Sequence, residues 1–187
     1  WVGFRIEKPG ERAYGANVMM DDRHYMRDYP RSPGRSASFI LIIVLTATFA
    51  LQQINAVYIG ADLDRWLELS PKGLASGFVW QLVTFQFLHA GLFHLLVNLV
   101  FLWMFGRQVE ERLGTASMLK IYFGGGLAGG LLQVMLGALL PTPFGAPVVG
   151  ASAGICALVA ACCLLEPDGV FLAFFVLPVK AIHFLII

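Results

Sequence analysis

Residues 39–59 read FILIIVLTATFALQQINAVYI, an almost unbroken apolar run that decides the fold of this chain. A helix rises 1.5 Å per residue, so about 20 residues cross a hydrocarbon core of about 30 Å. The chain of 187 residues is 58% hydrophobic and only 13% charged, whereas an average soluble domain carries about 25% charged residues. The sequence therefore predicts a membrane protein whose first spanning helix covers residues 39–59.

Further apolar runs follow this first helix. Membrane helices are expected at 78–105, 118–140 and 148–165, and a fifth is expected to begin at Pro178 and to be interrupted by the chain end. Polar turns separate these runs, except that residues 60–77 are mixed and contain tryptophan, as in a loop lying on the membrane surface. The pattern predicts an all-α, polytopic membrane helix bundle with about four and a half helices present.

The third apolar run is rich in glycine at a spacing typical of close helix packing. Small residues four apart allow two membrane helices to approach closely. The glycines concerned are Gly124, Gly125, Gly126, Gly129 and Gly130. We expect this helix to lie in close contact with a neighbouring helix.

The distribution of positive charge predicts the topology. Residues 1–38 are polar, rich in Arg, Gly and Pro, and lack a sustained periodic pattern, which predicts a flexible tail. This tail holds seven Lys and Arg residues, whereas the turn at 141–147 holds none. Cytoplasmic loops carry the excess of Lys and Arg, so the tail is expected in the cytoplasm. Residues 39–187 are expected to form a membrane domain, incomplete at its C-terminus, with Ser152 near the outer face of the plasma (inner) membrane if the source is bacterial.

Several classes of function are disfavoured. A net charge of +1 does not suit a nucleic-acid binder, which needs a basic face. Cys156, Cys162 and Cys163 lie within one apolar run and are interpreted as small hydrophobic residues. No HExxH string is present, so a metal site is not expected. No cofactor is expected either. The expected partners are the lipid bilayer and other membrane proteins.

The string Gly150-Ala151-Ser152-Ala153-Gly154 places a serine among small residues at the start of a predicted helix. Free backbone N–H groups at a helix start can stabilise a developing oxyanion. Alternatively, Ser152 could simply donate a hydrogen bond to a carbonyl one turn back. The string also matches the G-x-S-x-G elbow of soluble α/β-hydrolases, but that elbow requires a preceding buried strand, and here a turn precedes Ser152.

His89, His94 and Asn98 are polar residues within the second apolar run. Polar groups at membrane depth are costly and often functional. His94 and Asn98 are four apart and share one helical face, with His89 at the mouth of the helix. A zinc site would favour two histidines at i and i+4 with a third ligand. As donors in a site of low dielectric, these side chains suit an oxyanion hole.

Together these strings resemble the rhomboid family of intramembrane serine proteases. HAGLFHLLVN at 89–98 resembles the H-x-x-x-x-H-x-x-x-N of that family, and GAS at 150–152 resembles its G-x-S. GRQVEERLG at 106–114, with glycines flanking a glutamate, the glycine-rich third helix and the segment order are similar too. The resemblance covers roughly residues 37–187.

The resemblance implies a six-helix core with Ser152 as the nucleophile. It also implies that Asn98, His94 and the backbone N–H of Ser152 stabilise the oxyanion. His89 would then help to hold a loop and a water-filled cavity. The residues implied to support the active site are His89, Gly150 and Ala151.

Two features depart from the family pattern. Ala153 stands where rhomboids commonly have Gly, a change expected to narrow the site slightly. The general base of the family is a His on the sixth helix, which is expected beyond the end of this chain. His183 is near the expected start of the fifth helix and is interpreted as structural or interfacial.

The sequence thus predicts hydrolysis of a peptide bond in or beside the transmembrane segment of a membrane protein, through an acyl-enzyme on Ser152. The main alternative is a rhomboid-like protein that binds membrane clients without cleaving them. A transporter or channel is a third alternative, but it leaves the clustering of His89, His94, Asn98 and Ser152 unexplained.

Overall fold

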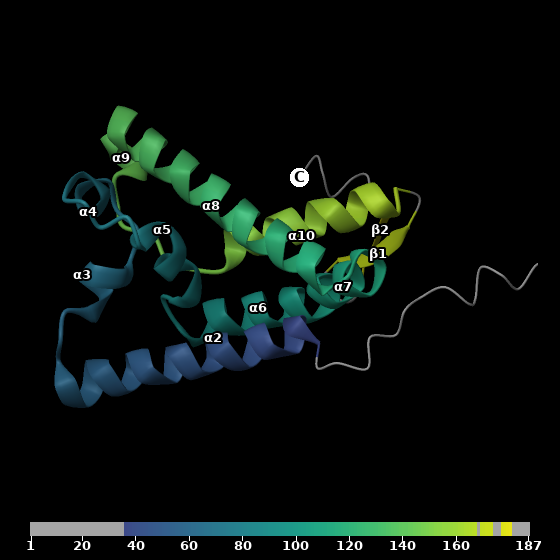
Figure 1. Cartoon of the computed structure of the whole chain (residues 1–187), viewed down its shortest axis with the longest axis horizontal. Coiled ribbons are helices and arrows are strands. Elements are labelled where there is room, and N and C mark those ends of the chain that lie inside the picture. The colour runs from purple at the N-terminus through teal and green to yellow at the C-terminus, as the bar shows by residue number, and fades with distance from the viewer. Residues whose placement is uncertain (1–35, 168, 174–176, 181–187) are drawn as a thin grey trace, which may run out of the picture. The chain divides into compact units, whose positions relative to one another are not determined.

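The computed structural model describes residues 36–167, 169–173 and 177–180, all within the unit Gly34–Ile187. Figure 1 shows that the described part is built almost entirely of helices, as predicted. The elements are α2 (Ala37–Ile54), the π-helical η2 (Asn55–Ile59), α3 (Leu63–Leu67), α4 (Pro71–Ala75), α5 (Gln81–Thr84), the 3₁₀ turn η3 (Phe85–Phe87), α6 (Leu92–Phe101), the π-helical η4 (Leu102–Gly106), α7 (Arg107–Leu113), α8 (Thr115–Leu139), α9 (Pro141–Phe144), α10 (Ser152–Leu165), β1 (Val170–Ala173) and β2 (Leu177–Lys180).

Three continuous helical stretches are long and apolar enough to cross a membrane. They are Ala37–Ile59 with 23 residues, Leu92–Leu113 with 22 and Thr115–Leu139 with 25. The shorter helix α10 has 14 residues and is also apolar. The first, third and fourth predicted helices are therefore present, although α10 begins at Ser152 and not at residue 148. The protein is a multi-pass membrane protein with a helical bundle.

Apolar side chains lie on both sides of these helices, as expected of a bundle surrounded by lipid. The buried core joins α2, η4, α8 and α10, and it includes Leu45, Leu102, Met118, Tyr122 and Leu158. Large apolar side chains also remain exposed, for example Phe39, Phe93 and Leu139. These helices thus carry apolar side chains on the buried face and on the outward face, and in a membrane the outward side chains would contact acyl chains.

The bounds of the second predicted helix, 78–105, were wrong. Leu88 and Gly91 have extended backbones, with ψ of 153° and 169°, so the chain leaves the helical conformation before α6. The membrane-spanning stretch instead begins at Leu92 and continues through α7. The polar residues expected in a connecting loop therefore lie on a helix, where Arg107 and Glu111 form an exposed ion pair at 2.7 Å, one turn apart. Gly114, with φ of 82°, then ends this helix.

The predicted fifth helix does not begin at Pro178. Residues 177–180 instead form β2, which pairs with β1 in antiparallel register, Leu172 opposite Pro178. Proline disfavours a helical conformation in the residue before it, which helps to explain the extended backbone at Leu177. Residues 181–187, including His183, lie outside the described residues, as do residues 1–35 of the predicted tail.

Helices α8 and α10 run side by side (Figure 1), and glycine makes their close contact possible. A Cβ on Gly129 would lie 2.7 Å from the Cβ of Ala153, and a Cβ on Gly125 would overlap the methyl group of Ala157. On the other helix, a Cβ on Gly154 would lie 2.6 Å from the backbone oxygen of Tyr122. The prediction of close packing is confirmed at Gly125 and Gly129 but not at Gly124, where a Cβ would meet nothing within 4 Å, and the packing fixes the helix that begins with Ser152.

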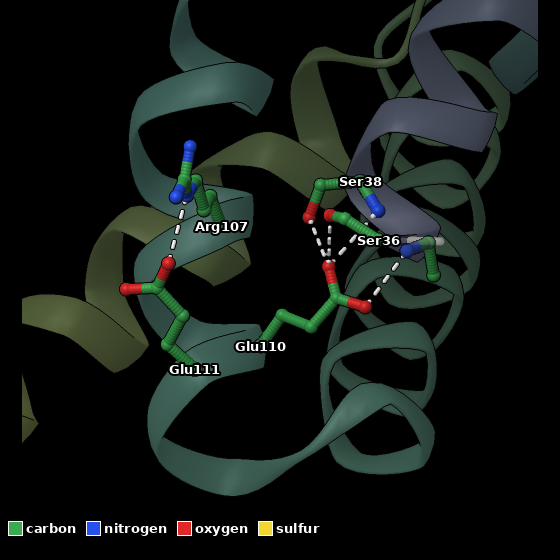
Figure 2. A network of polar contacts seen from close by, with 6 residues as sticks. Ser36, Ser38, Arg107, Glu110 and Glu111 are labelled. Carbon is green, nitrogen blue, oxygen red and sulfur yellow. Dashed lines mark hydrogen bonds and ion pairs between the residues drawn. The ribbon is translucent and has the colours of Figure 1, made fainter. Parts of the chain in front are cut away.

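A buried carboxylate joins the starts of two membrane helices at the opposite end of the bundle. Glu110 on α7 accepts hydrogen bonds from the Ser36 and Ser38 hydroxyls at 2.6 and 2.9 Å, and from the Ala37 and Ser38 backbone N–H groups at 2.7 and 3.1 Å (Figure 2). The Thr115 hydroxyl, in the first residue of α8, donates to the same carboxylate at 2.9 Å. This network fixes α2 and α8 to α7.

Candidate active site

Ser152 is the first residue of α10, and its side chain is exposed. The residue before it, Ala151, is fully buried and offers no side-chain cap to the helix. The first turn of a helix has backbone N–H groups without intrahelical acceptors. The start of α10 therefore combines an accessible hydroxyl with backbone donors.

The segment that leads into Ser152 is held by backbone hydrogen bonds. Leu69 and Val148 exchange two of them, at 3.1 and 2.9 Å, as an isolated antiparallel bridge. Two residues later, the N–H of Gly150 donates to the carbonyl of Phe85 at 2.9 Å. The segment before α10 is therefore attached to Leu69, between α3 and α4, and to Phe85 in η3.

Gly150 brings Ser152 and His94 together. A Cβ on Gly150 would lie 2.7 Å from Cε1 and 3.0 Å from Nε2 of His94, and 3.8 Å from Oγ of Ser152. The φ of Gly150 is +130°, a conformation that side chains disfavour. The absence of a side chain here lets the His94 ring approach the backbone two residues before the serine.

Asn98 lies one helical turn after His94 on α6 and is buried. Its side-chain Nδ2 donates to the backbone carbonyl of His94 at 2.8 Å. An amide group has two N–H donors, so one remains after this contact. Among the described residues no hydrogen bond joins Asn98 to Ser152, and Asn98 is connected to the site through the backbone of His94.

His89 is buried in the loop before α6, outside the membrane-spanning stretches. Its ring lies edge-on to the His94 ring, with centroids 5.3 Å apart and an interplanar angle of 64°. Neither ring nitrogen makes a hydrogen bond of regular geometry within the described part, although the Phe87 backbone lies near enough to influence the ring. Burial, and secondarily the neighbouring His94, lower the pKa of His89 to about 4, so this ring is neutral near pH 7.

One contact of this site was missed by the sequence analysis. The backbone N–H of His89 donates to the side-chain Oε1 of Gln52, on α2, at 3.0 Å. Gln52 is a polar residue inside the first apolar run, which was the signal available. The role of the Phe85 carbonyl had no sequence signal, because any residue supplies a backbone oxygen.

Among the described residues, no three His, Cys, Asp or Glu side chains gather closely enough to hold an ion. Cys162 and Cys163 are buried in α10, and Cys156 is exposed on it. The groups near the start of α10 are the Ser152 hydroxyl, the His94 ring and the backbone donors of the helix, and both Asn98 and His89 contact His94. Hydroxyl and donor groups of these kinds are the ones that acyl transfer uses.

Comparison with known proteins assigns the chain to a family. The Rhomboid domain model matches residues 76–187, which include His89, His94, Asn98 and Ser152. The chain belongs to the rhomboid family.

Curated relatives include both proteases and an inactive protein. The chain is 32% identical to Rhomboid-like protein 17, chloroplastic, of Arabidopsis thaliana, over 59% of this chain and 32% of the relative. It is 37% identical to the Putative rhomboid protease YdcA of Bacillus subtilis, over 44% of this chain and 39% of the relative. It is also 34% identical to the Inactive RHOMBOID-like protein 8 of Arabidopsis thaliana, over 44% of this chain and 24% of the relative. The matched segments thus span about a third of these relatives.

Proposed function

We propose that this chain contains the nucleophile and oxyanion-binding part of an intramembrane serine protease. The observation that carries the proposal is the convergence of the Ser152 hydroxyl and the His94 ring on the bare Cα of Gly150, at the start of α10. Similarity to a putative rhomboid protease supports it. The substrates proposed are membrane proteins, cleaved in or beside a transmembrane segment.

In the proposed reaction, Ser152 Oγ attacks the carbonyl carbon of the substrate and loses its proton to a general base. The carbonyl oxygen becomes an oxyanion, which the backbone N–H of Ser152, the His94 ring and the remaining Asn98 N–H would stabilise. The C–N bond then breaks, and the amine leaves with a proton returned by the base. Water hydrolyses the resulting ester on Ser152 and regenerates the hydroxyl.

The general base is a separate part of the proposal. Within the described residues the histidines are His89 and His94, and His94 is assigned to the oxyanion. The neutral, buried His89 contacts the His94 ring. Resemblance to the family favours a His on a sixth helix as the base, as expected from the sequence.

The membrane orientation also belongs to the proposal. The Lys and Arg residues before α2 and around α7 favour a cytoplasmic position for that end of the bundle. Ser152, at the opposite end of α10, would then face the outer side. Labelling of single cysteines at the ends of α2 with an impermeant reagent would establish this orientation.

The experiment that tests the reaction uses the complete protein in lipid bilayers with a membrane-embedded reporter. Ser152→Ala should abolish cleavage, and a fluorophosphonate should label the wild type but not this variant. His94→Ala and Asn98→Ala should each lower kcat by about 10²- to 10³-fold, the usual effect of losing one oxyanion donor. Cleavage that survives Ser152→Ala contradicts the assignment of the nucleophile.

A second candidate is a client-binding protein without proteolytic activity. The specific observation in its favour is the 34% identity to a relative named inactive. Under this alternative the complete wild-type protein would neither cleave a reporter nor react with the fluorophosphonate. It would still capture membrane proteins in photo-crosslinking, and to the same extent after Ser152→Ala.

A further inference from the structure

We propose that Gln52, on the first membrane helix, is a positioning residue for the oxyanion pocket and acts through His89 on His94. The proposal rests on the serine-protease function above, because it assigns a role within that site. It extends the site to α2, an element that contributes none of the groups proposed to contact substrate.

The first step is the contact between Gln52 and the loop before α6. Gln52 is half-buried, and its Oε1 accepts the backbone N–H of His89 at 3.0 Å. The loop is extended at Leu88 and at Gly91, so its N–H groups cannot all be satisfied within a helix. Buried backbone donors need an acceptor, and here Gln52 supplies one and joins the loop to α2.

The second step is the position of the His89 ring. This side chain is only 3% exposed, and neither ring nitrogen has a hydrogen-bond partner of regular geometry in the described part of the chain. Its orientation therefore depends on its own backbone, on the nearby Phe87 backbone and on packing. The His94 ring lies against it, with centroids 5.3 Å apart. A shift of the His89 backbone would therefore move the surface on which His94 rests.

The third step is the sensitivity of the oxyanion donor. A Cβ on Gly150 would lie 2.7 Å from Cε1 of His94, and the His89 ring lies against the same imidazole, so His94 has one neighbour in the loop before α6 and another two residues before Ser152. Catalytic groups act only when held within about 0.5 Å of the productive geometry. Loss of the Gln52 contact is therefore expected to weaken stabilisation of the oxyanion without removing any group that touches substrate.

The test compares two neighbouring glutamines of α2 in the complete protein, reconstituted in bilayers. Gln52→Met keeps the size of the side chain but removes the acceptor, and it should lower kcat by about 10- to 100-fold with little change in KM. Gln52→Glu keeps an acceptor oxygen and should recover most of the rate. The matched control is Gln53→Met, because Gln53 is exposed and makes none of these contacts.

A double-mutant cycle with His94→Ala separates positioning from general destabilisation. If Gln52 acts through His94, Gln52→Met should cost far less in the His94→Ala background than in the wild type. Multiplicative losses of rate, or a defect that only follows a lower melting temperature, would show that Gln52 has a purely structural role and would overturn the proposal.

A readout that needs no activity keeps this proposal distinct from the proposed function. In protein with isotopically labelled histidine, the His94 ring resonances can be assigned by their loss in His94→Ala. Gln52→Met should shift these resonances, whereas Gln53→Met should leave them in place. Wild-type protein that does not cleave would contradict the protease function alone. Unchanged His94 resonances in Gln52→Met would overturn the positioning role whether or not the protein cleaves.

Discussion

The carboxylate of Glu110 accepts the backbone N–H of Ala37 at 2.7 Å, across 73 positions of the sequence. Helix α2 has no side-chain cap of its own at this end. Its first N–H groups and the positive end of its dipole are therefore stabilised by an acidic residue from another helix. Gly106 leaves space for this contact, because a Cβ there would lie 3.1 Å from the Ser38 hydroxyl.

Glu110→Gln should lower the free energy of unfolding by about 1–3 kcal/mol. The amide keeps one acceptor oxygen but turns an NH₂ group toward donors that would be left without a partner. Unfolding in mixed detergent micelles would measure this change. The control is Glu111→Gln, since Glu111 is exposed and, within the described part of the chain, pairs with exposed Arg107. Equal stability of the two variants would contradict the capping role of Glu110.

Gly125→Ala should destabilise the protein by about 1–3 kcal/mol, because the added methyl group meets Ala157 across the contact of α8 with α10. Gly124 is the preceding residue of the same helix, and a Cβ there would meet nothing within 4 Å. Gly124→Ala should therefore be neutral or slightly stabilising, since alanine favours helix. The difference between the two unfolding free energies is the measurement, and a difference near zero would exclude close packing at Gly125.

Hydropathy predicted the spanning helices because about 20 consecutive apolar residues are a strong signal. Hydropathy could not locate the interruption of the helix at Leu88–Gly91, because the residues before and after this loop are also apolar. Short apolar runs do not distinguish helix from strand by composition alone. For this reason β1 and β2 were not predicted, and the fifth helix was expected from Pro178.

The site was predictable where its residues are close in sequence. The four-residue spacing of His94 and Asn98 places both on one face of a helix, and the small residues around Ser152 mark a close approach of backbones. The contact of Gln52 with His89 joins residues 37 positions apart. The contact of Gly150 with His94 likewise depends on how the loops fold, so neither contact could be predicted from local patterns.

Gly150→Ala should reduce activity to near the level of Ser152→Ala, because the new methyl group would overlap the His94 ring and the backbone has φ of +130°. The control is Gly77→Ala, where φ is +89° but nothing lies within 4 Å of the added Cβ. Both variants carry backbone strain of about 1–2 kcal/mol. Because only the Gly150 variant adds a clash with His94, only this variant should lose cleavage. Reporter cleavage at matched amounts of folded protein decides between them.

Acid should destabilise the wild type more than the His89→Asn variant. The pKa of folded His89 is about 4, below its ordinary value of 6.5, so the unfolded chain binds the proton first as pH falls. The contribution of neutral His89 to the free energy of unfolding is thus intact above about pH 6.5 and is progressively lost as the pH falls to about 4. Melting temperatures at pH 7.5 and pH 4.5 measure this. An equal fall in the melting temperatures of the wild type and His89→Asn would mean that His89 is not buried in its neutral form.

The length of α10 has a consequence for the depth of Ser152. Fourteen residues rise about 21 Å, about 9 Å less than the hydrocarbon thickness of a typical bilayer. Just beyond its far end, Glu166 pairs with Arg112 and accepts a hydrogen bond from Gln108 at 3.1 Å, and this charged group belongs at the lipid headgroups. With that end at one headgroup layer, an α10 that stands perpendicular to the membrane would place the serine below the opposite layer. The proposed hydrolysis would then require the local bilayer to thin or water to descend to Ser152.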